Sequence, residues 1–487
     1  MSVAEAAATP AAERRVPIHN ILTFGTLGVP LAATLVIFGV YLPRHYVSLG
    51  VGDFKAGSKE AFLAVTAALI SVRFIDVFFD PLVALGMDWT KTPIGRYRPW
   101  LLVGVPLTIL GVWKLLMPAG HVTAIYLVLW LAVTYAGMSM INLGVAAWSA
   151  VLANTYNDRS RLYGWLTAMG VVGSVAILAL PLATHGKIAA GVKSSMPTLG
   201  LILVIALPIA GLITAVLTPE RVLPIPKRPN FKAADYWRAL MRPSMFRLVV
   251  ADLMLALGPG VTGPLYVYYF HDAKGFTIPD VSLLLISYIG AGILGAPVWG
   301  RVASRFGKHR TVQIACVCYS ITQTILMALP RVHAPYSFAQ SVPTIAGMFA
   351  VGFCASAFLL LVRSMIADVA DEVKLEVKQD LTSLLFSMVT TTTKIGASIT
   401  VGVLPIIAWA GYNGAEGAVN SPHAIFVLEM CYLFAPIILV WFGGAMFFGY
   451  KLDSSRHAEI RAALDIAAAE ESLVGPLDTP PEIVAAE

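Results

Sequence analysis

The sequence predicts an all-α membrane protein with twelve transmembrane helices arranged as two sets of six. Three observations support this fold class. Hydrophobic residues make up 57% of the 487 positions and charged residues only 13%, whereas a soluble domain usually carries about 25% charged residues. The apolar residues fall in runs near the roughly 20 residues that span a bilayer. A short basic turn recurs in the two halves of the chain.

The apolar runs set the order of the helices and the domain organisation. A connector at residues 219–244 separates a first six-helix bundle (21–218) from a second (245–450), and residues 1–20 and 451–487 form polar tails. The second tail is rich in alanine and glutamate, and we expect a short amphipathic helix in it. We predict membrane helices at residues 21–43, 60–87, 99–118, 122–154, 162–184, 197–218, 245–271, 279–304, 309–330, 341–367, 380–411 and 422–450.

Lysine and arginine residues lie mainly on one side of these helices. Residues within three positions of a span end are counted with the adjacent side. Of the 34 basic residues, 23 then fall on the side that carries both tails, seven on the other side and four inside the predicted spans. Cytoplasmic loops are enriched in Lys and Arg. We therefore expect a multi-pass protein with both termini in the cytoplasm, in a cell membrane such as the bacterial inner membrane. The net charge of +6 is scattered over short loops, which indicates contact with lipid headgroups and no nucleic-acid partner.

A repeated turn relates the two sets of helices. The first copy is Gly-Arg-Tyr-Arg at residues 95–98, and the second is Gly-Lys-His-Arg at residues 307–310. Each follows the second helix of its set. A parallel repeat of six helices is the architecture of the major facilitator fold, which we predict for this chain.

Three ionisable residues stand inside the predicted second helix: Arg73, Asp76 and Asp80. Ionisable residues in a membrane span are costly and mark functional sites by default. Asp76 and Asp80 are four residues apart, so they share one helix face with Cβ atoms about 5–6 Å apart. Two carboxylates that close repel each other unless a proton or a metal ion relieves the charge. The pair therefore predicts a cation switch. In the alternative interpretation, Arg73 and Lys394 neutralise the pair permanently.

Lys394 lies inside the predicted eleventh helix, where a lysine must face a cavity or a carboxylate. We expect Asp76 or Asp80 to be its partner, so that cation and lysine compete for the same acids. The predicted seventh helix contains Gly-Pro-Gly-Val-Thr-Gly-Pro at residues 258–264, followed by aromatic residues that include Tyr266. Prolines interrupt helices, and broken helices in transporters line cavities. The aromatic run either closes over substrate or forms an interfacial belt.

Two segments resemble the glycoside–pentoside–hexuronide:cation symporter family. They read RFIDVFFDP at residues 73–81 and GMDWTKTPIGRYRPW at residues 86–100. Matches at Trp148–Ser149, at Asp158–Arg159 and at Lys394 extend the resemblance over nearly the whole membrane domain. The resemblance implies a cation site at Asp76 and Asp80 beside Lys394, and substrate contact at Trp148. It also implies a cytoplasmic gate formed by Asp88, Arg96, Arg98, Asp158, Arg363 and Asp368.

The chain departs from the sugar-transporting relatives at four positions. Two acids that bind sugar hydroxyls in those relatives fall at Pro30 and Gly144 here. Because desolvated hydroxyls each need a partner, the pocket is expected to prefer a less polar, larger or anionic solute. An amide and a hydroxyl that serve sodium fall at Phe79 and Ile141. Sodium needs several oxygen ligands, whereas a proton needs one carboxylate, so we favour proton coupling, with sodium as the alternative. Asp76 and Asp80 are metal ligands only in the sodium case.

These observations predict a secondary transporter that imports a small organic solute, such as a glycoside or an amphipathic compound, together with a cation. A proton-driven exporter of amphipathic compounds is the alternative. Motifs of hydrolases and nucleotide-binding loops are missing from the sequence, so we predict no enzymatic activity and no cofactor besides the coupling ion. We expect the chain to act as a monomer. The substrate contacts are predicted at Trp148, Gly144, Tyr266 and Lys394.

Overall fold

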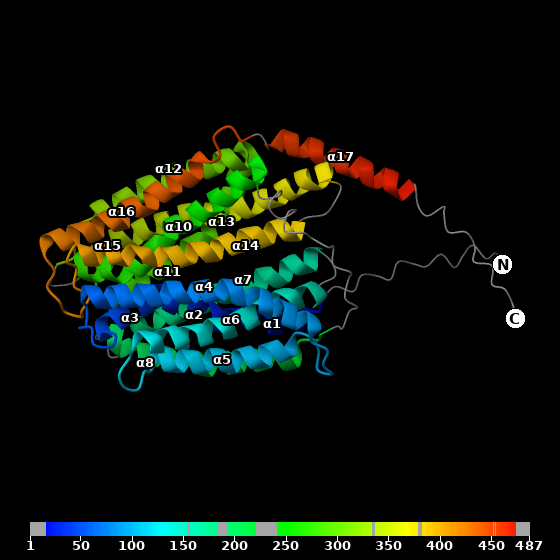
Figure 1. Ribbon diagram of the computed structural model, residues 1–487. Helices are drawn as coiled ribbons and strands as arrows, with labels where there is room; N and C mark the ends of the chain where they lie inside the picture. The colour runs from blue at the N-terminus through cyan, green and yellow to red at the C-terminus, as the bar shows by residue number, and fades with distance from the viewer. Residues whose placement is uncertain are drawn as a thin grey trace.

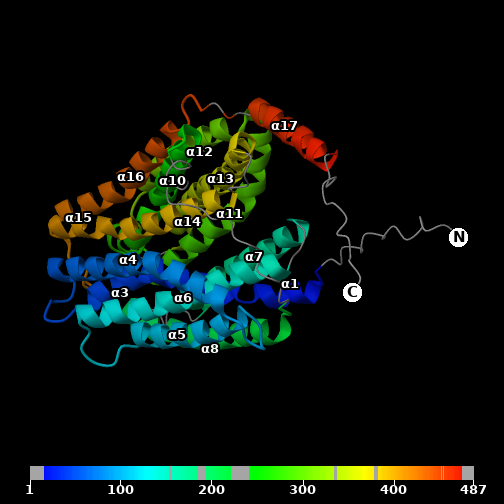
Figure 2. The same cartoon turned by 45° about the vertical axis from the view of Figure 1, so that its right-hand side comes forward.

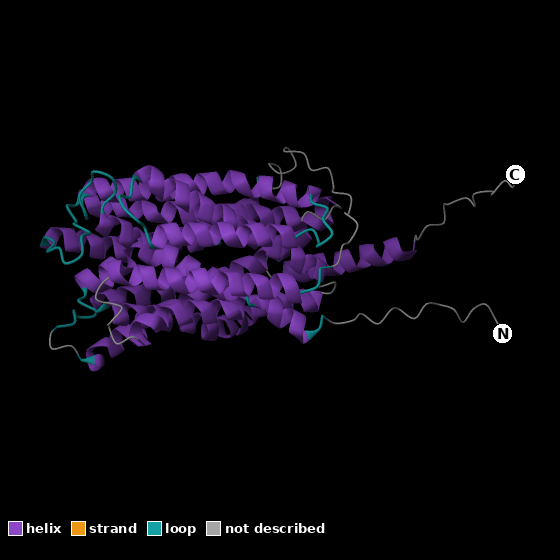
Figure 3. Ribbon diagram, turned by 90° about the horizontal axis from the view of Figure 1, so that it is seen from below, coloured by secondary structure: helices purple, strands orange, loops and turns teal. Residues whose placement is uncertain are grey.

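The structure is a computed structural model that describes residues 16–152, 156–183, 192–220, 241–333, 337–377, 382–450, 452 and 454–473. Within these ranges the regular structure is helical throughout (Figure 3). In lipid, a helix satisfies its own backbone hydrogen bonds, which is why an apolar chain of this kind folds as helices. Twelve helices in the described part of the chain are long and apolar enough to cross a membrane, so the predicted number of spans is confirmed.

The first half of the chain contains six of these spans. The first span is a continuous stack of short helices with a π-helical turn in its middle, and the others are single helices. In order they are α1 (Ile18–Gly25), α2 (Gly28–Val36), η1 (Ile37–Tyr41) and α3 (Leu42–Leu49), then α4 (Lys59–Trp89), α5 (Arg98–Leu116), α6 (Ala124–Leu152), α7 (Tyr156–Ala183) and α8 (Val192–Leu217).

The second half contains the other six spans and a terminal helix that is too polar to cross a membrane. The spans are α10 (Pro243–Val267) with the π-helical turn η2 (Tyr268–Ala273), α11 (Ile278–Phe306), α12 (Lys308–Ala328), α13 (Phe338–Val377), α14 (Thr382–Ile399) with η3 (Thr400–Val403) and α15 (Leu404–Trp409), and α16 (Pro422–Ala445). The terminal helix is α17 (Ser454–Leu473), which lies in the predicted polar tail.

The helices of both halves run along one common direction and form two bundles side by side (Figure 1). We name the two ends of the molecule after the short helices that mark them. The α15 end holds α15 and α3, and the α17 end holds α17 and the start of α1. The bundles meet through α4 against α14 and α15, and through α7 against α11. Figure 2 shows the two bundles close together at the α15 end and farther apart toward the α17 end.

The predicted break in the seventh helix is wrong in position. Helix α10 continues through Pro259 and Pro264, and the irregular part is the π-helical turn η2, which follows them. A proline removes one backbone donor, and the helix tolerates that loss at both positions. Helix α13 also extends ten residues beyond the predicted end at 367, to Val377. Most of the predicted connector, residues 221–240, lies outside the described residues.

Candidate functional site

The two carboxylates of α4 meet the lysine of α14 between the two halves. The Lys394 ammonium donates to Oδ2 of Asp80 and lies 3.4 Å from Oδ2 of Asp76. Asp76 is only 5% exposed. Oδ1 of Asp80 is buried and has no hydrogen-bond partner among the described residues. The predicted partnership of the pair with Lys394 is therefore present, and one buried carboxylate oxygen is left over.

Helix α6 supplies a hydroxyl to the same site. Ser139 donates to Oδ1 of Asp76 at 2.7 Å. The sequence analysis found Ile141 where a hydroxyl was expected, with Asn142 as its neighbour. Asn142 instead donates to the carbonyl of Met138 in its own helix. Ser139, two residues before Ile141, therefore supplies a hydroxyl to Asp76 that the sequence analysis did not consider.

Arg73 lies on α4 near the pair but does not bind it. Its guanidinium stacks on the ring of Tyr135, 4.0 Å from the ring centroid. Among the described residues, Arg73 makes no hydrogen bond or ion pair. In the alternative interpretation, Arg73 and Lys394 both neutralise the carboxylates. In this conformation only Lys394 contacts them.

A cavity of about 260 Å³ opens beside this cluster, between the halves. Arg73 is the only charged residue among its described lining residues, and Tyr135, Thr393 and Thr400 supply the other polar groups. A second cavity of about 320 Å³ in the second half shares Ala256 and Thr393 with it. The remaining lining of the first cavity is small or apolar: Phe38, Gly39, Val40, Leu69, Ala256, Gly260, Gly263, Pro264, Ala397 and Val401.

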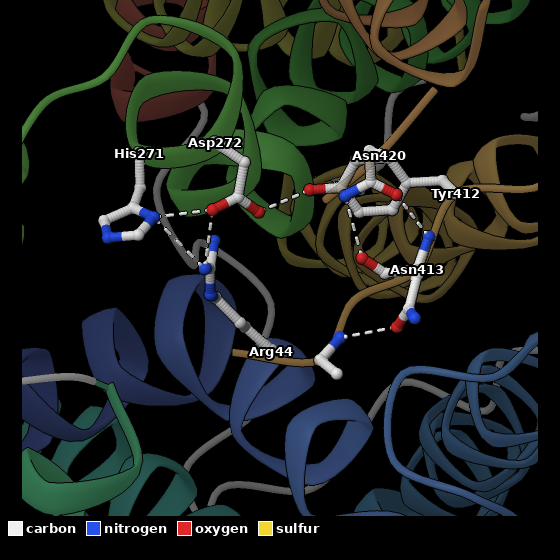
Figure 4. A network of polar contacts seen from close by, with 7 residues as sticks. Arg44, His271, Asp272, Tyr412, Asn413 and Asn420 are labelled. Atoms are coloured by element: carbon white, nitrogen blue, oxygen red, sulfur yellow. Dashed lines mark hydrogen bonds and ion pairs between the residues drawn. The ribbon is translucent and has the colours of Figure 1, made fainter. Parts of the chain in front are cut away.

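An ion pair joins the halves at the α15 end (Figure 4). Nη2 of Arg44, from α3, lies 2.8 Å from Oδ1 of Asp272 in η2, and Arg44 is only 2% exposed. Nδ1 of His271 lies 2.5 Å from the same oxygen, and the Tyr412 hydroxyl donates to Oδ2. Burial, together with the charge of Asp272, raises the pKa of the Tyr412 phenol well above its usual value, so it remains a donor. Arg44 is one of the seven basic residues counted on the side opposite the tails, and the sequence analysis did not consider Asp272.

Further contacts join the halves at the same end. The Tyr41 hydroxyl lies 2.9 Å from that of Ser282, and the Gly414 amide donates to the Gly57 carbonyl at 3.1 Å. Gly57 has a φ of +72°, and a Cβ there would lie 2.1 Å from the Ala415 amide nitrogen. Only glycine therefore allows the two loops to approach this closely.

Comparison with known proteins assigns the chain to a family. The sequence model of the family described as MFS/sugar transport protein matches residues 23–454. The chain belongs to this family. It is 26% identical over 403 residues to the putative glycoside/cation symporter YagG of Escherichia coli, covering 80% of this chain and 84% of that protein. It is 22% identical over 512 residues to the human sodium-dependent lysophosphatidylcholine symporter 1, covering 96% and 92%.

The solved structures agree on the fold. The nucleoside transporter NupG superposes with a TM-score of 0.63 at 15% identity, over 89% of this chain and 99% of that one. At this identity the likeness concerns the fold alone, and it confirms the predicted major facilitator fold. The family and the relatives make the chain a secondary transporter of the major facilitator kind, a multi-pass cation symporter and not an enzyme. The resemblance to the glycoside–pentoside–hexuronide:cation symporters is confirmed with it.

Three residues for which the sequence predicts substrate contacts in this MFS transporter are buried in protein contacts. Trp148 is 1% exposed, donates to the Pro219 carbonyl at 3.1 Å and packs edge-on against Phe24. Gly144 is buried on α6, where an added Cβ would face Met87 of α4. Tyr266 donates from its hydroxyl to the Val281 carbonyl at 3.0 Å. Their predicted role therefore requires a different conformation, and only Lys394 of this set lies at the carboxylate pair.

Two of the predicted gate residues belong to the turn before α5. The carboxylate of Glu220, just after α8, accepts hydrogen bonds from the backbone amides of residues 96–98. Nε of Arg96 donates to the Met87 carbonyl at 2.7 Å, and Nη2 of Arg98 donates to the Thr218 carbonyl at 2.7 Å. Glu220 was missed by the sequence analysis because it follows the last predicted helix of its half. The side chain of Asp88 lies outside the described structure.

The other predicted gate residues also bond within their own half. Asp158 accepts from the Val16 amide and from Arg161, both at 3.1 Å. Nη2 of Arg363 donates to the Thr393 hydroxyl at 3.2 Å, and that hydroxyl donates to Asp252 at 3.0 Å. Arg363 therefore belongs to a polar network next to Lys394.

Asp368 binds residues of the second half only. Both of its oxygens accept from Lys308 at 2.7 Å, and Nε2 of His457 on α17 lies 3.6 Å away. Between described residues, no ion pair connects the two halves at the α17 end. The predicted cytoplasmic gate therefore stays a prediction.

Proposed function

We propose that the Asp76–Asp80 pair is the coupling-cation site of this symporter and that Lys394 competes with the cation for it. The observation that carries the proposal is the lysine from the second half bound to two acids of the first half, with Oδ1 of Asp80 buried and unpartnered. Burying a carboxylate is costly unless its charge is compensated. A cation that binds this oxygen compensates the charge and releases Lys394, so occupancy changes how the halves are held together.

A proton is the coupling ion that this site suits best. A hard metal cation takes several oxygen ligands at once. Apart from the two acids, Ser139 is the one described side chain that hydrogen-bonds to the pair through oxygen, and it donates its hydrogen to Asp76. A proton needs only one carboxylate oxygen. Sodium is the second candidate because the human relative is named a sodium-dependent symporter.

The α17 end is proposed to face the cytoplasm, with the cavity open toward that side. Most basic residues of the loops lie at this end, as the positive-inside rule expects of cytoplasmic loops. The closed α15 end, tied by Arg44 and Asp272, would then face outward. Transport by alternating access requires the contacts between the halves at the α15 end, such as Arg44–Asp272, to break. It also requires the α17 end to close around the same central site.

The solute is proposed to be a small organic compound with few hydroxyl groups to satisfy. Relatives of the chain are named for glycosides, raffinose and lysophosphatidylcholine, so the family alone does not choose among them. Arg73 is the only charged residue in the described lining of the central cavity. That described lining contains no Asp or Glu side chain that could accept hydrogen bonds from sugar hydroxyls. Such a lining suits a less polar or an anionic solute.

Transport by purified protein in proteoliposomes tests the cation site. The solute is chosen by thermal-shift screening of glycosides, sugars, carboxylates and lysolipids. In a one-to-one symport, an inward gradient of one pH unit supports up to about tenfold accumulation. We expect Asp80→Asn and Asp76→Asn to abolish accumulation while leaving exchange of labelled for unlabelled solute. Lys394→Ala should uncouple or inactivate transport.

The controls separate ion, site and fold. Asp53→Asn removes an exposed loop carboxylate and should leave accumulation unchanged. If a sodium gradient at equal pH on both sides drives accumulation, the coupling ion is sodium and not a proton. Undiminished accumulation in both aspartate variants would remove the proposed cation site, and a fully coupled Lys394→Ala protein would reduce Lys394 to a structural partner.

A further inference from the structure

We infer that Arg73, held on the ring of Tyr135, binds the anionic group of the solute, so that the transported compound is an organic monoanion. The inference rests on the proposed cation site and deepens it, because it names a substrate class. It places solute and cation about one turn apart on the same face of α4. The chemistry required of the solute is one carboxylate, sulfonate or phosphate-type group carrying a single charge.

The position of Arg73 is that of a ligand-binding group. Its guanidinium borders the cavity between the halves, and the Tyr135 ring 4.0 Å away holds one planar face. Tyr135 is itself fixed by edge-on packing against Phe38, at 6.1 Å between ring centroids. Stacking on an aromatic ring leaves the N–H edge of a guanidinium free to donate, and that edge matches a carboxylate bidentately.

The other cations near the cavity are already engaged. Lys394 is bound to Asp76 and Asp80, and Arg363 is connected through Thr393 to Asp252. Arg73 has no hydrogen bond or ion pair with any residue of the described ranges. Its N–H groups therefore remain available to donate to an anionic group that enters the cavity.

Charge balance explains why such a solute would be coupled to a cation. Arg73 and Lys394 together balance Asp76 and Asp80, so the empty group is formally neutral. One bound cation gives the group a charge of +1, and one bound monoanion restores neutrality. A net charge in this low-dielectric interior is costly, so the half-loaded forms are disfavoured. Each ligand therefore raises the affinity for the other.

Equilibrium binding to the purified protein tests the inference without any ion gradient. The probes are matched pairs of an acid and its neutral partner: benzoate with benzamide, benzenesulfonate with benzenesulfonamide, and D-glucuronate with D-glucose. Ligand that binds the folded state raises its thermal stability in proportion to the logarithm of concentration over Kd. We expect at least one acid to bind about tenfold or more tightly than its neutral partner.

Variants then assign the effect to Arg73. Arg73→Gln should abolish the preference for the acid, and Arg73→Lys should keep part of it. Asp80→Asn leaves the group with a charge of +1 and should tighten acid binding severalfold. Arg301→Gln, an exposed arginine of α11, should change nothing.

The outcomes separate this inference from the proposed cation site. If no acid of the panel binds more tightly than its neutral partner, or if Arg73→Gln keeps the preference, the inference is wrong. Loss of accumulation in Asp80→Asn would still support the cation site in that case. Because the comparison of acid and neutral partner uses the unaltered protein, it holds even if Arg73→Gln fails to fold.

Discussion

The two ends of this transporter are held together in different ways. At the α15 end, Arg44 pairs with Asp272 and the Gly414 amide bonds to Gly57, so side chains and backbone connect one half to the other. At the α17 end, each ion pair between described residues lies within one half. Glu220 caps the start of α5 in the first half, for example.

The difference indicates which contacts must change during transport. Rigid bodies that rock against each other keep their internal contacts and exchange those at their interface. The ties of the α15 end cross the interface, so they should break when this end opens. The ties of the α17 end lie inside each half, so they should persist in both conformations. Three perturbations test this division, in order of the effect expected.

Breaking the Arg44–Asp272 pair should have the largest effect. Removing one partner of a buried ion pair leaves an uncompensated charge and costs about 3–5 kcal/mol. That cost falls on the conformation in which the α15 end is closed, so Asp272→Asn and Arg44→Gln should shift the population strongly toward an open α15 end. Spin labels at residues 54 and 419, both exposed loop positions of this end, should then report a longer distance.

The labelled experiment needs a matched background and control. The four native cysteines are free and are replaced first. Asp280→Asn removes a carboxylate of the same end whose described contact is local, because it accepts from the Thr277 hydroxyl, and should leave the distance unchanged. A second label pair at residues 91 and 305 should move closer as the first pair separates. Unchanged distances in both Asp272→Asn and Arg44→Gln would show that the ion pair does not hold this end closed.

Removing the Glu220 carboxylate should have an intermediate effect, confined to the first half. Glu220→Ala leaves three amide donors of the turn before α5 without their acceptor, which costs about 1–2 kcal/mol. We expect a lower unfolding midpoint and faster hydrogen exchange of the amides of residues 96–98, with no change in the label distance at the α15 end. Glu220→Gln keeps one acceptor oxygen, so its unfolding midpoint and exchange rates should lie between those of the unaltered protein and Glu220→Ala.

The loop geometry gives an independent check on the same cap. Gly95 has a φ of +123°, and a Cβ there would lie 2.1 Å from Oε2 of Glu220. Gly95→Ala should therefore displace the carboxylate and reproduce the exchange pattern of Glu220→Ala. Glu416→Ala removes an exposed glutamate of the α15 end and serves as the control. If Glu220→Ala opens the α15 end, the two halves are not independent bodies.

The sequence predicts the spans well because each membrane helix corresponds to a run of apolar residues. It also predicts the pairing of Lys394 with Asp76 and Asp80, since charges inside a membrane must find each other. It does not predict Ser139 as their partner, because Ser139 and Asn142 lie one turn apart on the same side of α6 and the packing of α6 against α4 decides which of them meets the pair. Helix rotation depends on packing against several neighbours, and a single sequence does not specify it.

The α15 ties were missed for a different reason. Arg44 and Asp272 stand at the α15 ends of the first span of each half, and their opposite charges were available as a signal. Counted by charge alone, Arg44 is an ordinary loop residue, and Asp272 lies just past the predicted end of its helix. The repeat that relates the halves makes the first and seventh helices equivalent, and comparing equivalent ends would have singled out this pair.

Releasing α17 should have the smallest effect. His457 and Arg461 lie 3.1 and 3.5 Å from the carboxylate of Asp371 on α13, and both contacts are partly exposed. Exposed ion pairs contribute about 0–1 kcal/mol and are screened by salt. His457→Ala with Arg461→Ala should hardly change the unfolding midpoint, yet should raise the rate of proteolysis within residues 454–473, as should high salt. Glu459→Ala, whose described ion pair is with Arg456 in α17 itself, is the matched control. A change of the α15-end label distance in the double variant would mean that α17 takes part in the movement of the halves. An unchanged distance would mean that α17 moves with the second half and does not influence that movement.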